Sequence, residues 1–283
     1  MFSKKHSRKN VKSYVVYLGL FLYGCFLLFP IYFALVTSIK PNLELYSKEY
    51  NPLWVLKPTL DHFIYLFEKT SFLMWAKNSF IVAVFSTAIS ITIGAVAGYA
   101  IARLRYRGSQ PMAAVIFITY LVPTSLLFLP MANLVRELGL FDRQIALIIV
   151  YPTFLIPFCT LLMTGYFRSI PKELEECATV DGATRIQAFW KIALPLSLPG
   201  LVSAGLFAFT MSWDEFLYAL VLTQSSSVKT LTVGVVSQLH LADVYFWGSL
   251  MAAALLGSIP IVIIYSFFLE YYVKGLTAGA VKG

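Results

Sequence analysis

Charged residues are scarce in this sequence. Asp, Glu, Lys and Arg make up 13% of the 283 residues and 59% are hydrophobic, whereas a soluble domain is typically about a quarter charged and about half apolar. Because soluble helices keep a polar face, long stretches without any charge exclude a soluble globular domain. Six such stretches, each of at least 22 residues, are 13–39, 78–102, 108–135, 144–167, 192–213 and 244–269.

Cysteine and histidine are also rare. Cys25, Cys159 and Cys177 form no Cys-x-x-Cys pair, and two of them fall inside apolar stretches, which predicts free thiols and no disulfide framework. The three histidines are far apart in the sequence, so no metal site is expected.

Sequence motifs for hydrolytic or nucleotide chemistry are absent. The chain has no His-Glu-x-x-His and no Gly-x-Ser-x-Gly motif. Gly200 and Gly205 have the spacing of a phosphate-binding loop, but Leu206 and Phe207 follow where lysine and a hydroxyl residue are needed. We therefore expect no enzyme, no ATP binding and no cofactor in this chain, although a membrane enzyme remains the rival class.

Each charge-free stretch is long enough to cross a membrane, since about 20 apolar residues span roughly 30 Å of hydrocarbon. The sequence predicts an all-α integral membrane protein with six transmembrane helices. The second contains Gly94 and Gly98, at a spacing typical of close helix packing. The predicted spans are about 14–39, 78–102, 112–134, 144–167, 198–222 and 245–271.

Prolines are concentrated in two neighbouring spans, with Pro123 and Pro130 in the third and Pro152 and Pro157 in the fourth. Proline removes a helix hydrogen bond, so these spans are predicted to be broken or bent. The freed carbonyls need partners inside a bundle, which favours a position along a pathway. Proline is also common in membrane helices generally, and the two interpretations weigh evenly.

The net charge of +8 is an orientation signal and not the mark of a nucleic-acid partner. If the chain crosses the membrane six times, 14 of its 22 basic residues fall on one side. Short loops rich in Lys and Arg stay in the cytoplasm, so both termini are predicted to be cytoplasmic. The 14 residues are Lys4, Lys5, Arg8, Lys9, Lys12, Arg103, Arg105, Arg107, Arg168, Lys172, Arg185, Lys191, Lys274 and Lys282.

The loop 168–199, between spans four and five, is predicted to form two short helices. Pro171 suits a first helical turn, and three glutamates follow at the positive end of the helix dipole. Gly182 is expected to end this helix. The second helix is predicted to run to about Ala193, with Pro195 ending it.

Both predicted helices have one apolar face and therefore need an apolar partner, either the membrane surface or another protein. Their acidic residues disfavour an anionic bilayer surface, so docking onto a protein is the favoured interpretation. The apolar faces consist of Leu174, Cys177 and Ala178 in the first helix and Ile186, Phe189, Trp190 and Ala193 in the second.

These residues resemble the EAA motif of the permeases of binding-protein-dependent ABC importers. The motif reads Glu-Ala-Ala, a glycine a few residues later, then Ile-x-Leu-Pro; Cys177 stands where the family usually has alanine. The resemblance implies that the loop 168–199 couples the chain to a separate ATPase subunit. The residues implied in this coupling are Glu176, Cys177, Ala178, Asp181, Gly182, Ala183, Phe189, Ile192, Leu194 and Pro195.

The resemblance covers nearly the whole chain and narrows to the carbohydrate branch of this family, similar to the maltose-type G subunit. It implies the type I ABC importer permease fold in a bacterial or archaeal plasma (inner) membrane, and import of a sugar by alternating access. The residues that carry it are 58–60, 63, 78–79, 171–174, 213–216 and 275–283.

The implied partners are a second, F-type permease in a heterodimer, two ATPase subunits, an extracytoplasmic sugar-binding protein and membrane lipid. ATP and Mg would be bound by the ATPase subunits. The sugar stays open between a monosaccharide, an oligosaccharide and glycerol phosphate, because the binding protein sets much of the selectivity in this family. We expect residues 1–71 to form the N-terminus, first span and external loop, residues 72–272 a core permease domain, and residues 273–283 a cytoplasmic tail.

A second candidate site is Trp213, Asp214 and Glu215 in span five. Asp214 is predicted about 24 Å along that helix, near the outer interface. Either both acids reach headgroup water, or one lines the external mouth of the pathway or the seam with the partner. Many relatives have asparagine where this chain has Asp214. An ion channel or secondary transporter is the further alternative, but two acids within spans are few for proton coupling.

Overall fold

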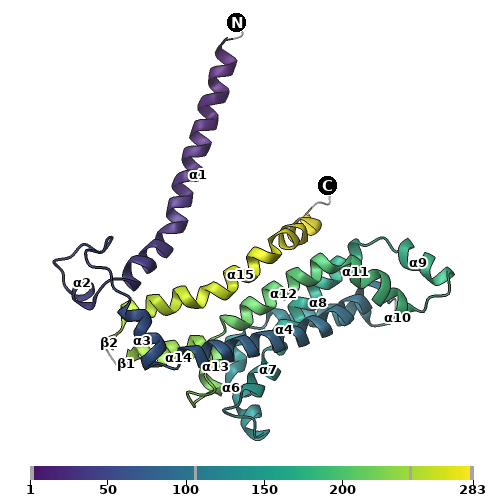
Figure 1. Ribbon diagram of the computed structural model, residues 1–283. Helices are drawn as coiled ribbons and strands as arrows, with labels where there is room; N and C mark the ends of the chain where they lie inside the picture. Colours follow the sequence, from purple (N-terminus) through teal and green to yellow (C-terminus); the bar gives the residue numbers. More distant parts are fainter. Residues whose placement is uncertain (1–2, 105–106, 242–243, 281–283) are drawn as a thin grey trace. The chain divides into compact units, whose positions relative to one another are not determined.

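The structure is a computed structural model that describes residues 3–104, 107–241 and 244–280 (Figure 1). Arg105 and Lys282 of the charge pattern lie outside these ranges, as do residues 281–283 at the end of the stretch 275–283 that carries the family resemblance. The described chain is helical apart from one pair of two-residue strands. The predicted all-α class is confirmed.

The chain divides into two compact units, and the first comprises residues 1–70 and 235–258. Its buried residues include a polar cluster: the Nε2 atom of His62 lies 2.8 Å from the carbonyl oxygen of Lys40, and its Nδ1 atom 3.3 Å from the Ser249 hydroxyl. The unit contains α1 (Ser3–Ser38), α2 (Asn42–Tyr46) and α3 (Asp61–Lys69), and β1 (His240–Leu241) antiparallel to β2 (Val244–Tyr245).

The second unit comprises residues 71–234 and 259–283. Two helices, α14 (Leu231–Leu239) and α15 (Trp247–Ala280), have residues in both units. The second unit further contains α4 (Phe72–Arg103), α5 (Ser109–Leu121), α6 (Thr124–Glu137), α7 (Gln144–Val150), α8 (Pro152–Ser169), α9 (Glu173–Val180), α10 (Arg185–Ala188), the π-helical η1 (Phe189–Ala193), α11 (Leu194–Leu196), α12 (Leu198–Trp213) and α13 (Leu217–Leu222).

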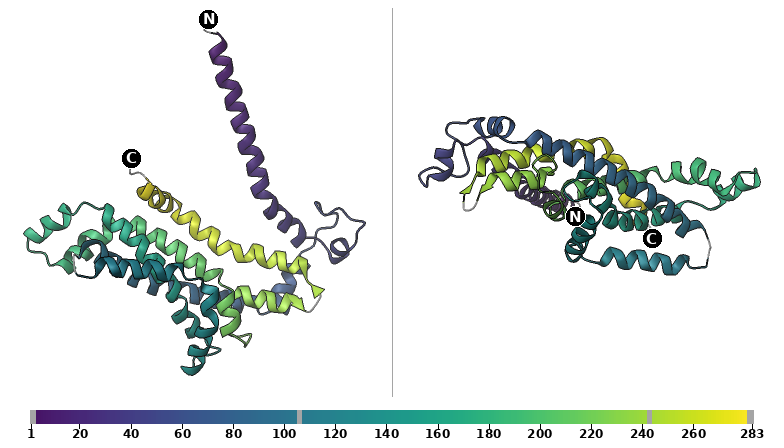
Figure 2. Two further views of the ribbon diagram at one scale, coloured as in Figure 1. Left: turned by 180° about the vertical axis from the view of Figure 1, so that it is seen from behind. Right: turned by 90° about the horizontal axis from the view of Figure 1, so that it is seen from below.

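Three helices, α4, α8 and α12, lie side by side and form the core of the second unit (Figures 1 and 2). Glycines permit the close approach of α4 to α8. A Cβ atom added at Gly94 would lie 2.5 Å from the Cβ atom of Cys159, and one at Gly98 would lie 2.9 Å from the Cβ atom of Met163. The predicted small-residue packing surface is therefore confirmed.

The described residues contain four helices that are long and apolar enough to cross a membrane, and two bent helix pairs that pass the same test. Counting each pair as one span gives six, the predicted number. The four helices are Val16–Ser38, Phe72–Arg103, Gln144–Ser169 and Trp247–Leu269; the pairs are Ser109–Leu121 with Thr124–Glu137 and Arg185–Leu196 with Leu198–Trp213.

Span three is broken as predicted, because α5 and α6 meet at 93° beside Pro123. Span four is not broken, since Gln144–Ser169 forms one candidate span, and a bend at its prolines stays a prediction. Tyr151 keeps helical backbone angles between α7 and α8, and Pro152 occupies the first turn of α8. The hydroxyl of Thr153 donates to the Val150 carbonyl at 2.6 Å, so a side chain satisfies a carbonyl beside the proline.

Span five differs from the prediction at both ends. The continuous helix expected over 198–222 is wrong, since α12 ends at Trp213 and α13 begins at Leu217. At the other end, α12 meets the preceding helical segment at 73°, beside Ser197. The loop 168–199 therefore joins the core through a sharp bend.

Candidate functional site

The first helix of the loop 168–199, α9, ends at a glycine as predicted. Gly182 has φ +88°, a left-handed conformation that favours glycine. Its N–H donates to the Thr179 carbonyl at 3.1 Å, and the N–H of Ala183 donates to the Ala178 carbonyl at 2.9 Å. These two bonds form a Schellman motif and fix the chain reversal between the two helices.

The second helix begins with a capping box and is longer than predicted. The N–H of Gln187 donates to the Thr184 hydroxyl, and the Gln187 side chain accepts from the N–H of Thr184. Helical structure continues through η1 to Leu196, so the predicted end near Ala193 is wrong. The widened π-helical turn ends at Ala193, two residues before Pro195, a residue that cannot donate a helix hydrogen bond.

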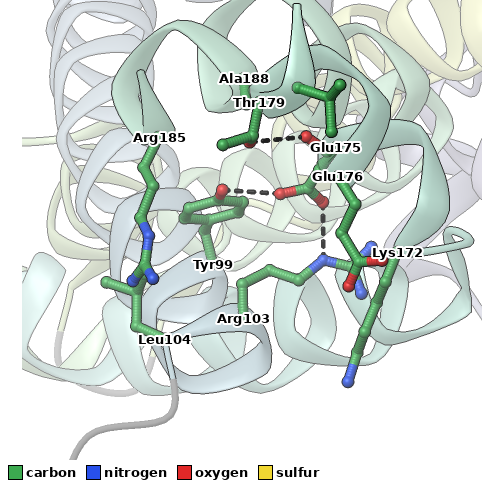
Figure 3. A pocket seen from close by; sticks show the side chains of 10 residues that line it. Tyr99, Arg103, Leu104, Lys172, Glu175, Glu176, Thr179, Arg185 and Ala188 are labelled. Atoms are coloured by element: carbon green, nitrogen blue, oxygen red, sulfur yellow. Dashed lines mark hydrogen bonds and ion pairs between the residues drawn. The ribbon is translucent and has the colours of Figure 1, made fainter. Parts of the chain in front are cut away.

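A partly buried ion pair attaches α9 to the C-terminal end of α4 (Figure 3). The Nε atom of Arg103 lies 2.7 Å from Oε1 of Glu175, and these side chains are 5% and 12% exposed. The hydroxyl of Tyr99 donates to the other carboxylate oxygen at 2.7 Å. Arg103 also donates to the Ile170 carbonyl at 2.7 Å, so one guanidinium holds both α9 and the turn before it.

Aromatic packing attaches the second helix to the same end of α4. The ring of Phe189 lies 4.7 Å from that of Tyr99 and 6.1 Å from that of Phe167, centroid to centroid. Phe189 and Ala193 are buried, whereas Ile186 and Trp190 are 71% and 59% exposed. The apolar face predicted for this helix is therefore divided: one side packs against the membrane helices and the other is free for another contact.

The predicted coupling residues fall into three groups. Most of them are fully or partly exposed on the surface of the loop. At Gly182 itself, an added Cβ atom would meet nothing within 4 Å. Glu176, Cys177, Asp181, Gly182 and Pro195 are exposed, Ala178, Ala183, Ile192 and Leu194 are partly exposed, and Phe189 is buried. Exposed apolar side chains beside them are Leu174, Val180, Ile186 and Trp190.

A pocket of about 400 Å³ lies between α9, α10 and the end of α4 (Figure 3). Lys172, Arg185 and Glu176 line it beside the ion pair of Arg103 and Glu175. One guanidinium nitrogen of Arg103, Nη1, is buried and has no hydrogen-bond acceptor. No cluster of three metal-ligating side chains occurs in the portion of the chain that the structure describes.

Sequence reasoning missed Tyr99, Arg103 and Glu175 as site residues. Arg103 was counted only as an orientation charge, and Glu175 was grouped with Glu173 and Glu176 as a helix-dipole residue. The available signal was the position of Tyr99 and Arg103, which are four residues apart and therefore on one face at the end of a span.

The second candidate site forms a break in the span rather than a pair of acids on one helix. The carboxylate of Glu215 accepts hydrogen bonds from the Tyr151 hydroxyl at 2.9 Å and from the N–H groups of Tyr218 and Ala219 at 2.8 and 3.0 Å. It thus satisfies the N-terminus of α13. Asp214 is exposed, and Trp213 is buried and stacked on Phe209. The two acids therefore have different surroundings.

Comparison with known proteins agrees with these features. Residues 90–278 match the model of the family described as binding-protein-dependent transport system inner membrane component. The chain belongs to this family. The match includes the whole loop 168–199 and both candidate sites.

Curated relatives of this family align over almost the whole chain. The chain is 35% identical to the inner membrane ABC transporter permease protein YcjP of Escherichia coli, over 98% of this chain and 99% of that protein. It is 38% identical to the sulfoquinovosyl glycerol transport system permease protein SmoH of Agrobacterium fabrum, over 90% and 89%. These relatives are permease proteins, which confirms that the chain is a transporter subunit and not an enzyme.

Solved structures share the fold. A chain of a bacterial ABC transporter involved in import of the acidic polysaccharide alginate superposes with a TM-score of 0.78 at 22% identity, covering 96% of this chain and 99% of that one. A chain of an alginate transporter in complex with an alginate pentasaccharide-bound periplasmic protein gives 0.69 at 16% identity, covering 94% and 95%. The predicted ABC importer permease fold is confirmed.

Proposed function

We propose that this chain is the permease subunit of an ATP-driven importer that moves a sugar into the cytoplasm by alternating access. The loop 168–199 makes the contact with the partner ATPase. The observation that carries this proposal is the divided surface of the loop. It is held to the membrane helices by Glu175 and Phe189, while apolar side chains around Gly182 remain exposed.

A contact that transmits force must be rigid and specific, and the loop meets both needs. The Schellman motif and the capping box fix the corner between its helices, and Gly182 lies there in open space. A partner surface can therefore approach the backbone at this corner closely. Both candidate coupling helices present side chains to the same partner from either side of the corner.

The assembly comprises a second permease, two ATPase subunits and an extracytoplasmic sugar-binding protein, with ATP and Mg bound by the ATPases. The relatives named above support this composition, because they are permease proteins of transport systems. Both termini and the loop 168–199 lie in the cytoplasm. Reporter fusions after Arg107, Ser225 and Gly283 should read inside, outside and inside, and an outside reading at Gly283 would contradict this orientation.

Gly182→Asp tests the contact with the ATPase. Aspartate tolerates a left-handed backbone better than most residues, and Asp142 of this chain has φ +58°. The variant should reach the membrane in normal amount but no longer co-purify the ATPase or support uptake, because its side chain occupies the docking corner. Membrane level, co-purification and uptake are measured on the same preparation.

Gly139→Asp is the matched control. Gly139 also has a positive φ, +67°, and a Cβ atom there also meets nothing within 4 Å. It lies outside the loop 168–199, so the control should co-purify the ATPase normally. Normal ATPase binding and uptake in Gly182→Asp, at normal expression, would refute the proposed contact. The transported sugar itself is identified by binding measurements on the cognate binding protein with a panel of sugars.

A further inference from the structure

The last turns of α4 hold both halves of the loop 168–199. Tyr99 and Arg103 are four residues apart, so their side chains share one face of the helix. Tyr99 contacts both halves, since its hydroxyl donates to Glu175 on α9 and its ring packs against Phe189 on η1. None of the residues of α9 is buried, so the Glu175 carboxylate is its main attachment.

The opposite end of α4 holds a second loop, the segment 224–231, which follows α13 and ends at the first residue of α14. The indole N–H of Trp75 donates to the Ser226 carbonyl at 3.0 Å. The side-chain amide of Asn78 donates to the carbonyls of Ser227 and Lys229, each at 2.9 Å. Backbone groups of this segment are therefore bound directly by side chains of the first turns of α4.

Between these two attachments α4 is an uninterrupted helix. It has 32 residues and is therefore about 48 Å long at 1.5 Å per residue. Among the candidate spans in the described ranges, only α4 contains no proline. Contact with α8 at Gly94 and Gly98 further restricts bending.

The loop 168–199 is also joined to α8 and α12 through the chain itself, but neither connection is a straight continuous helix. On one side the chain leaves α8 through extended backbone at Ile170, with φ −75° and ψ 131°. On the other side it enters α12 through the 73° bend beside Ser197. A displacement of the loop can be absorbed at Ile170 or at the bend beside Ser197. The side chains that attach the loop to α4, in contrast, belong to an uninterrupted helix.

We propose that α4 is the rigid element that makes the loop 168–199 and the segment 224–231 move together. Tyr99, Arg103, Trp75 and Asn78 act as positioning residues at its two ends. The inference rests on the proposed function, in which the ATPase acts on the loop 168–199. It adds the route by which that action reaches the far side of the span.

The test follows the segment 224–231 while the ATPase is trapped. Gln224 is exposed, and Gln224→Cys places a single reactive thiol there once Cys25, Cys159 and Cys177 are replaced by alanine. The complete transporter is reconstituted and labelled with a maleimide, with and without Mg·ATP and orthovanadate. Trapping should change the labelling rate several-fold.

Two variants should remove this change while the ATPase stays bound. Glu175→Gln deletes the charge that holds α9 to α4, and Asn78→Leu deletes the hydrogen bonds at the other end. Glu173→Gln and Lys77→Gln are matched controls, because both residues are neighbours on the same helices that lie outside these attachments, and both should keep the change. Tyr99→Phe, which removes only the hydroxyl, and Trp75→Phe, which removes the indole N–H together with part of a buried ring system, replace any variant that fails to reach the membrane.

The inference is overturned if the labelling rate does not respond to trapping in the unaltered background, or if the response survives in the variants at both ends. The proposed function fails separately, if Gly182→Asp still co-purifies the ATPase. Loss of the ATPase in Gly182→Asp together with an unchanged response in Glu175→Gln and Asn78→Leu refutes the role of α4 alone.

Discussion

The two halves of the loop 168–199 are attached to the membrane helices by opposite kinds of interaction. The first half, α9, has no buried residue and is held through the charge of Glu175. The second half is held by packing of Phe189 and Ala193, without an ion pair in the described residues. A packed attachment is weakened when buried side-chain volume is removed, whereas a charged one is weakened when either charge is removed. The difference predicts distinct costs for substitutions on either side of Gly182.

The largest effect is expected in the packed half. Phe189→Ala removes an aromatic side chain that is 7% exposed, and such truncations cost about 3–5 kcal/mol. The melting temperature of the purified transporter should fall accordingly. Ile186→Ala is the control, because this side chain is 71% exposed and should change stability by no more than about 0.5 kcal/mol. Equal effects would contradict the division of this helix into a buried and an exposed face.

In the charged half, removing one partner of the ion pair should cost more stability than removing both partners together. Arg103→Gln leaves the Glu175 carboxylate without its cation and should cost about 3 kcal/mol, in the range for broken buried pairs. Adding Glu175→Gln should recover some of this loss, since no uncompensated charge then remains. Thermal unfolding of the two single variants and the double variant measures this. Additive losses in the double variant would show that the pair is not coupled.

A smaller effect is expected at the start of the second helix. Thr184→Ala removes the capping hydroxyl of α10, which should cost about 1 kcal/mol and speed hydrogen exchange of residues 185–190. Thr179→Ala is the counterpart in α9, where the hydroxyl donates to the Glu175 carbonyl within the helix. It should leave exchange in α9 unchanged, because alanine is the better helix former. Faster hydrogen exchange in both Thr184→Ala and Thr179→Ala would contradict the expected difference between the two helices.

The smallest effect is expected at Asp142, a carboxylate that holds a loop from the surface. The pKa of Asp142 lies below its usual value. Partial burial alone would raise this pKa, but hydrogen bonds from Ser225 and from the Gln224 N–H, together with nearby Lys229, outweigh that effect. A lowered folded-state pKa contributes stability that is present above about pH 4 and lost as the pH falls. Asp142→Asn should therefore remove a small acid-dependent loss of stability, measured by melting at pH 7 and at about pH 2. An unchanged pH dependence would contradict this role.

The sequence predicted the elements whose cause is local. Charge-free runs predicted the spans, Pro123 marked a break, and Gly182 marked a left-handed helix end. Two features depended on distant partners and were not predictable in this way. The break after Trp213 has no proline or glycine and follows from the Glu215 carboxylate, which caps α13 and meets Tyr151 from another span.

The choice of Glu175 over its neighbours has the same origin. Glu173, Glu175 and Glu176 are chemically alike, and only the position of Arg103 at the end of α4 decides which of them forms the ion pair. Fine detail of the second helix was also out of reach, because the π-helical turn before Pro195 has no simple sequence signal. Local chemistry thus predicted where the chain turns, and tertiary contacts decided what holds each turn.

Photocrosslinking at Ile186 tests the central claim most directly. A benzoylphenylalanine introduced there replaces a side chain that is 71% exposed, in the helix that follows Gly182, whereas Phe189 is buried. Irradiation of membranes that contain the complete transporter should give a product in which the permease is joined to the ATPase subunit. Irradiation that gives efficient crosslinks to lipid or to other proteins, but none to the ATPase, would contradict the account.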